Sequence, residues 1–221
     1  MKTTWNPLFS QWTTHAVFSH FNLSEDLEHQ DALSWFNAHP VLLSESLEAQ
    51  LEFLRKRLRG LYQSWNETEL LARFIGPLLN LVDFWGPNYN FFLERKLAVR
   101  FGSRKLSGSV DGLVARGVDV PLQPFFFLHV YKKIKDNEGD PKGQLLIAMI
   151  AAQHLNANSG PLYGCYVIGP YWRFVYLDGT TFAESQGYDA TDAGELQIIW
   201  NILHETKRRI EARVALLESM P

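Results

Sequence analysis

The stretch that decides the fold runs from Pro124 to Lys135 and reads PFFFLHVYKKIK. A continuous apolar run of this length is typical of a strand that is covered on both faces, as in the centre of a sheet. The run ends abruptly in Lys132, Lys133 and Lys135. Because charged side chains are rarely buried without a partner, we expect positive charge to be needed at this end of the strand.

The segments around this strand alternate between strand and helix patterns. The sequence predicts strands over residues 90–102, 105–117 and 162–185, and helices over residues 24–40, 44–61, 67–85, 137–158 and 193–219. Ser24 is expected to cap the first helix, and the third is expected to bend or restart near Gly76–Pro77. Asp140 is expected to cap the fourth, with Pro141 at its first position.

The order of these elements predicts an α/β fold with the sequence α-β-β-β-α-β. A helix between the third and fourth strands allows a crossover, so we expect a central mixed sheet flanked by helices. We predict two parts, a helical N-terminal extension over residues 1–45 and an α/β domain with a C-terminal helix over residues 46–221.

Composition restricts the classes of protein. The chain of 221 residues is 46% hydrophobic, which is enough for a sizeable core, and it has a net charge of −3. Binding to a polyanion therefore depends on local basic clusters, which lie at Arg55–Arg59, Arg95–Lys105 and Lys207–Arg213. A single cysteine, Cys165, excludes a disulfide scaffold within one chain. The longest apolar run, residues 145–152, is too short to span a bilayer, so we expect a cytoplasmic protein with no membrane segment.

The element order, with an acid in the second strand and a lysine in the third, resembles the PD-(D/E)xK nuclease superfamily, which has the restriction-endonuclease-like fold. The resemblance covers roughly residues 64–188. It assigns the second-strand acid to Asp111, the acid-x-lysine triplet to residues 130–132, and the helix acid to Glu69. It implies a phosphodiesterase that uses Mg²⁺ or Mn²⁺ and acts on nucleic acid, with DNA as the favoured substrate.

The resemblance also implies roles for the side chains. Asp111 and Glu69 are expected to be the metal ligands, and Lys132 to steady the attacking hydroxide or the charge on phosphorus. Substrate contacts are expected from three further residues, Lys133, Lys135 and Gln144. Residues i and i+2 of a strand point to one face, so the triplet's acid and lysine would converge beside Asp111.

The triplet's acid is absent, because its position holds Val130, which cannot bind a metal. Three explanations stay open. The site is degenerate and the fold serves binding or structure; or Glu69 or Glu94 supplies the missing ligand, with Gln144 as a neutral helper; or Val130 replaces an acid that a parent chain carried.

Each of these residues also has a purely structural interpretation. Asp111-Gly112 is a good turn dipeptide, the lysines can be a solvated strand end, and Glu69 can pair with Asn66 in a helix cap. His129 and Cys165 are expected to be packed inside. Two alternatives to the nuclease are therefore kept. One is an inactive nuclease-fold module that binds nucleic acid or a protein partner, and the other is a protein that forms a homodimer through its C-terminal helix.

Overall fold

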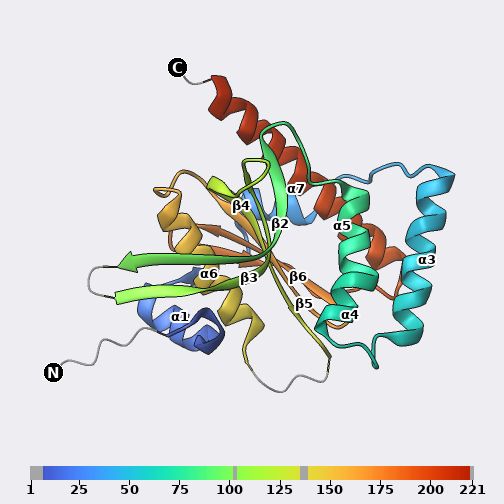
Figure 1. Ribbon diagram of the computed structural model, residues 1–221, viewed down its shortest axis with the longest axis horizontal. Helices are drawn as coiled ribbons and strands as arrows, with labels where there is room; N and C mark the ends of the chain where they lie inside the picture. Colours follow the sequence, from blue (N-terminus) through green and yellow to red (C-terminus); the bar gives the residue numbers. More distant parts are fainter. Residues whose placement is uncertain (1–6, 102–103, 135–138, 220–221) are drawn as a thin grey trace.

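The computed structural model describes residues 7–101, 104–134 and 139–219. Among them, one mixed sheet lies between two layers of helices (Figure 1), so the predicted α/β class with a central mixed sheet flanked by helices is confirmed. The strands are β1 (Ser24–Glu25), β2 (Tyr89–Phe101), β3 (Arg104–Arg116), β4 (Leu122–Lys132), β5 (Leu162–Ile168), β6 (Tyr171–Asp178), β7 (Thr181–Glu184) and β8 (Tyr188–Asp189). Their order is β1-β7-β6-β5-β4-β3-β2, with β8 paired to β6.

The helices divide between the two faces. They are η1 (Phe9–Gln11), α1 (Thr14–Phe21), α2 (Gln30–Phe36), α3 (Glu45–Leu61), α4 (Glu67–Leu70), η2 (Leu71–Ile75), α5 (Gly76–Val82), α6 (Pro141–Leu155) and α7 (Ala193–Ser219). One apolar cluster joins η1, α1 and α6 to the sheet, and a second joins α2, α3, α5 and α7 to its other face. Residues 7–45 contribute to both clusters.

The central strand β4 behaves as its sequence predicts. Its residues from Pro124 to Tyr131 are buried, and it pairs in parallel with β5 and antiparallel with β3. The predicted crossover between β4 and β5 is α6. This helix begins where Asp140 accepts a hydrogen bond from the backbone N–H of Gly143, with Pro141 at its first position as expected.

The predicted interruption near Gly76–Pro77 is present. The helix passes through η2, which has π-helical geometry, and continues as α5 from Gly76. Pro77 has no N–H to donate to the preceding turn, which favours such a widening. A Cβ atom on Gly76 would lie 2.9 Å from the carbonyl oxygen of Leu71, so the close turn also needs a glycine.

The predicted helix start at Ser24 is wrong. Ser24 and Glu25 form the edge strand β1, which pairs in parallel with Thr181 and Phe182 of β7. Helix α2 begins six residues later, and the side chain of His29 accepts the capping hydrogen bond from the N–H of Ala32. Pairing along the sheet edge therefore overrides the local capping preference of the serine.

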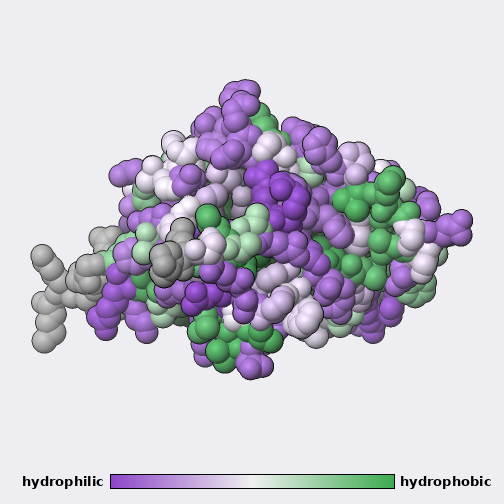
Figure 2. Space-filling model, turned by 90° about the horizontal axis from the view of Figure 1, so that it is seen from above, coloured by the Kyte–Doolittle hydropathy of each residue, from purple (hydrophilic) through white to green (hydrophobic). Residues whose placement is uncertain are grey.

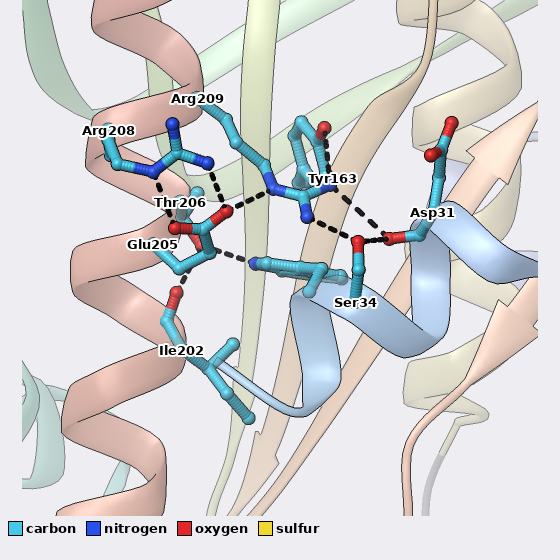
Figure 3. Close-up of polar contacts among 9 residues, drawn as sticks. Asp31, Ser34, Tyr163, Ile202, Glu205, Thr206, Arg208 and Arg209 are labelled. Carbon is cyan, nitrogen blue, oxygen red and sulfur yellow. Dashed lines mark hydrogen bonds and ion pairs between the residues drawn. The ribbon is translucent and has the colours of Figure 1, made fainter. Parts of the chain in front are cut away.

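A network of polar contacts ties α2 to α7 and to β5 (Figure 3). The guanidinium of Arg209 donates to Glu205 of its own helix, to Ser34 on α2 and to the Tyr163 hydroxyl on β5. Beneath it, the indole N–H of Trp35 donates to the Thr206 hydroxyl at 2.8 Å. The N-terminal and C-terminal helices are thus joined through buried as well as exposed groups.

The apolar stripe of α7 is used inside the chain. Its members from Leu196 to Val214 that face the sheet are buried in the second cluster. These side chains are not available for a second copy of the chain. Leu216, which is 57% exposed, is the large apolar side chain that α7 leaves at the surface, and a homodimer through this helix stays a prediction. Among the described residues, none of the helices has the length and apolar character needed to cross a membrane.

Candidate functional site

The candidate site lies where the sheet forks. Strands β3 and β4 pair from Arg116–Leu122 to Gly112–His129. Beyond that point β3 stays with β2 as far as Phe101–Arg104, while β4 stays with β5 as far as Lys132–Ile168. In Figure 1 the β2–β3 hairpin accordingly runs to the left of the sheet's centre, and β4 runs to the lower right, toward α4.

Asp111 is the first residue of β3 inside this fork. Its carboxylate oxygen Oδ2 accepts a hydrogen bond from the backbone N–H of Tyr131 at 2.6 Å, in place of a strand carbonyl. The interpretation of Asp111-Gly112 as a turn is wrong, because both residues lie within β3. A glycine is needed at position 112, since a Cβ atom there would lie 2.8 Å from the ring of Phe91 and 3.1 Å from the Tyr131 hydroxyl.

The surroundings of Asp111 raise the pKa of its carboxyl group. Burial is the largest cause, because it disfavours the charged form, and the negative charges of Glu67 and Glu94 act in the same direction. The hydrogen bond from Tyr131 and the positive charge of Lys132 act in the opposite direction. The four charged groups are therefore close enough to influence one another, although they come from α4, β2, β3 and β4.

Lys132 reaches from β4 to the start of α4. Its ammonium nitrogen Nζ lies 3.3 Å from Oε1 of Glu67, and both side chains are partly exposed. The helix acid beside the lysine is thus Glu67. Glu69, which the resemblance assigned to the site, completes a capping box with Asn66 and forms an ion pair with Arg73 at 3.2 Å. The Asn66-x-x-Glu69 spacing is the sequence signal that pointed to the cap.

Val130 precedes Lys132 by two residues on β4. It is fully buried, pairs with Tyr166 of β5, and packs in the cluster beneath α6. Strand alternation puts Val130 and Lys132 on one face, as predicted from the spacing. The structure therefore places an apolar side chain at the position where the superfamily pattern has its acid.

Glu94 on β2 lies opposite Asp111 and has a strained backbone conformation. In the β2–β3 ladder Leu93 pairs with Gly112 and Arg95 with Val110, so Glu94 faces Asp111 without being part of the regular pairing. Its φ of 50° is in the left-handed region, which is uncommon for a residue other than glycine. Such strain is often found at functional sites.

A groove of about 560 Å³ leads from the hairpin to Asp111. It is lined by residues of β2 and β3, by Leu8, Phe9 and Ser10 at η1, and by Gln144 at the start of α6. The groove is lined by Leu8, Phe9, Ser10, Lys96, Leu97, Ala98, Lys105, Ser107, Gly108, Ser109, Asp111 and Gln144. The structure thus brings Gln144 to the site, together with Lys96 and Lys105 of the predicted basic cluster, and it adds Ser107 and Ser109, which the sequence did not point to.

The other predicted site residues lie elsewhere. Lys133 is exposed beyond the end of β4, and Lys135 lies outside the described residues. His129 and Cys165 are both fully buried on the opposite face of the sheet, with Nδ1 and Sγ 3.3 Å apart. Burial lowers the pKa of His129 to about 3, so this histidine is neutral at physiological pH. Both residues are packed, as predicted.

The side chains present do not fit a magnesium site. Mg²⁺ needs several oxygen ligands in near-octahedral geometry. Within the described part of the chain, no three His, Cys, Asp or Glu side chains are grouped closely enough to hold a metal ion. One oxygen of Asp111 is already engaged by Tyr131, Glu67 is paired with Lys132, and Val130 offers no ligand.

A second depression lies between α3 and α5, with a volume of about 440 Å³. Figure 2 shows apolar surface, in green, over the part of the molecule where these helices lie. Phe53, which is 62% exposed, lines this depression together with Leu54, Pro77 and Leu81. It has no charged lining residue, in contrast to the groove at Asp111.

The comparisons with known proteins identify no relative. No protein-family model matches the chain, and no curated protein matches it.

Proposed function

We propose that the protein binds nucleic acid through the groove and the fork, and that in the chain as it stands it holds the phosphodiester backbone without cutting it efficiently. The observation that carries the proposal is the meeting of Asp111 on β3 and Lys132 on β4 at the fork, beside a groove that contains Lys96 and Lys105. The net charge of −3 makes a local basic groove the place for such binding.

The resemblance to the PD-(D/E)xK superfamily supports the same proposal. An acid and a lysine from adjacent strands at the open end of a sheet are the arrangement that the resemblance implies. Val130 is the reason for proposing binding rather than efficient hydrolysis, because it is a buried apolar side chain at the position where the resemblance implies a carboxylate. The restriction-endonuclease-like topology itself is part of this proposal.

A metal-dependent nuclease is the second candidate. It is favoured by the presence of another acid, Glu67, within the electrostatic reach of Asp111. A rearranged Glu67, released from Lys132, would give the site a second carboxylate, and Mg²⁺ or Mn²⁺ would then be the cofactor. The favoured substrate of this candidate is DNA.

Binding to fluorescently labelled oligonucleotides, measured by anisotropy in buffer with EDTA, tests the first candidate. We expect the chain to bind without metal, and Lys132→Ala to weaken binding because a positive charge is lost at the fork. Arg116→Ala is the matched control, since it removes one positive charge from an exposed position at the other end of β3, outside the three basic clusters. The proposal fails when no nucleic acid binds, or when both variants weaken binding equally. Cleavage by the unmodified chain with Mg²⁺ or Mn²⁺, lost in Asp111→Ala, would favour the nuclease.

A further inference from the structure

Beyond the fork, the β2–β3 hairpin has one buried face and one open face. The side chains of the buried face pack in the first apolar cluster with η1, α1 and α6, and they are Leu97, Val99, Leu106 and Val110. Gly108 belongs to the same face, and a Cβ atom there would lie 2.4 Å from the ring of Phe9. The helices that cover the hairpin are therefore all on this one side of it.

The open face carries the residues that alternate with the buried ones. Three cross-strand pairs form it, which are Lys96–Ser109, Ala98–Ser107 and Arg100–Lys105. All six residues are exposed except Ser107, which is partly exposed. The second apolar cluster, on this side of the sheet, takes from the described parts of β2 and β3 only Tyr89, Phe91 and Val114, which lie before the fork. Figure 1 shows the hairpin running to the left, away from α3, α4 and α5.

This open face is positively charged. It holds Lys96, Arg100 and Lys105 and no acidic residue, although the whole chain has a net charge of −3. Within the described ranges, neither Lys96 nor Arg100 forms an ion pair. Arg95 of the same predicted basic cluster pairs with Val110 and so lies on the other face. The charge of the open face is complementary to that of a polyanion.

The side chains between the three cations are short. Ala98, Ser107 and Ser109 let phosphates approach the strands, and the two hydroxyls can donate to phosphate oxygens. The face has no aromatic side chain, whereas proteins that hold single strands stack the bases on aromatic rings. A duplex needs no such stacking partner, because its bases are already stacked and it presents a charge about every 1.7 Å along its axis.

From this face we propose that the protein docks on a nucleic-acid duplex through the open side of the β2–β3 hairpin, with its three cations on the phosphates. The contact extends beyond the groove, since Arg100 is not among the residues that line it. It ends at the fork, because Asp111 follows Ser109 by two residues on β3. The inference rests on the proposed function, since it names the class of nucleic acid and the surface that holds it.

The experiment compares a labelled DNA duplex of mixed sequence with its labelled strand alone. Anisotropy is recorded in EDTA over a series of salt concentrations, and we expect the duplex to bind more tightly. Lys96→Ala and Arg100→Ala should each reduce the slope of log K against log salt by about 0.9, the value for one phosphate contact on a duplex. Arg116→Ala is the matched control and should leave the slope unchanged, because Arg116 lies at the other end of β3.

A charge reversal makes the test specific to this face. Ser109→Glu puts a negative charge between the cations and should weaken duplex binding more than Ser109→Gln, which has nearly the same shape without the charge. Equal binding by these two variants overturns the inference, as do unchanged slopes in Lys96→Ala and Arg100→Ala. Tighter binding of the single strand also overturns it. In each of these cases the proposed function stands if Lys132→Ala still weakens binding. A chain that binds neither duplex nor single strand overturns both.

Discussion

The carboxylate of Asp111 and the backbone N–H of Tyr131 lie 2.6 Å apart at the point where β3 and β4 separate. A side chain thus completes the hydrogen bonding of a central strand where the neighbouring backbone turns away. The same side chain is the acid that the proposed function assigns to the site. Asp111 therefore has a structural and a proposed functional role, and the two can be tested separately.

Replacement of Asp111 by asparagine should stabilise the protein at neutral pH. The amide oxygen can still accept from Tyr131, and the buried charge is removed. Because the folded-state pKa of Asp111 lies above the ordinary value of 3.8, its contribution to stability is fully present below that value and is lost as the pH rises through the folded-state pKa. Urea denaturation should show an advantage for Asp111→Asn near neutral pH that disappears in acid. A variant that is less stable at neutral pH would contradict this account.

Val130→Glu should convert the fork into a site that responds to metal. In EDTA the new carboxylate is buried without a partner, and we expect a loss of about 3 kcal/mol in the free energy of unfolding. Mg²⁺ or Mn²⁺ should restore much of it, by about 2.7 kcal/mol at a metal concentration one hundred times the dissociation constant. Thermal melting with and without metal measures both effects.

Val130→Gln is the control for that experiment, because it has nearly the shape of glutamate and lacks the charge. It should show no metal-dependent shift in melting temperature, and neither should Val130→Glu combined with Asp111→Asn. A shift of equal size in the unmodified chain would show that metal binds without residue 130.

Gly112→Ala should destabilise the protein through overpacking. The added methyl group would meet the Phe91 ring at 2.8 Å and the Tyr131 hydroxyl at 3.1 Å, and we expect a loss of about 1 to 3 kcal/mol. Gly60→Ala is the matched change, because nothing lies within 4 Å of its Cβ position near the end of α3. In that helix alanine should stabilise by up to about 1 kcal/mol. Equal effects at the two glycines would rule out the steric explanation.

Thr206→Val should weaken the junction between α2 and α7. The valine has nearly the same volume but leaves the buried indole N–H of Trp35 without its acceptor, which costs about 1 to 3 kcal/mol. Thr206→Ser keeps the hydroxyl and should cost less. Chemical denaturation of the two variants measures the difference, and a valine variant as stable as the serine variant would contradict the role of this hydrogen bond.

His129 should make the protein sensitive to mild acid. Its pKa is about 3 in the folded chain against an ordinary value of 6.5, so below pH 6.5 the unfolded chain takes up a proton that the folded chain does not. Its contribution to stability is therefore present above pH 6.5 and falls by at most about 1.4 kcal/mol per pH unit below it. His129→Phe should remove this part of the pH dependence in urea denaturation. An unchanged pH profile would refute the assignment.

The sequence predicted the features that local pattern controls. The apolar run of β4, the capping of α6 by Asp140 and the interruption at Gly76–Pro77 follow from residue types alone, and all are present. The pairing of Asp111 with Lys132 came from the resemblance to the PD-(D/E)xK superfamily, whereas the two-residue period of a strand placed only Val130 and Lys132 on one face.

The errors have a common physical cause, which is competition between local preferences and distant contacts. Ser24 looks like a helix cap, but the edge of β7 recruits it into β1. Glu67 and Glu69 both lie at a helix start, and only the position of Lys132 at the end of β4 decides which one reaches the fork. The groove could not be predicted either, because Leu8 and Ser107, which both line it, are about a hundred residues apart along the chain.

The hydrogen bond between Asp111 and Tyr131 makes one amide proton a reporter of the site. A ligand that takes the place of Tyr131 at Oδ2 releases the backbone N–H of that residue. Occupancy should therefore speed the exchange of that proton with deuterium and move its NMR resonance, while the amides deeper in β4 stay protected. The exchange rate and chemical shift of a single backbone amide can thus show whether the site is filled.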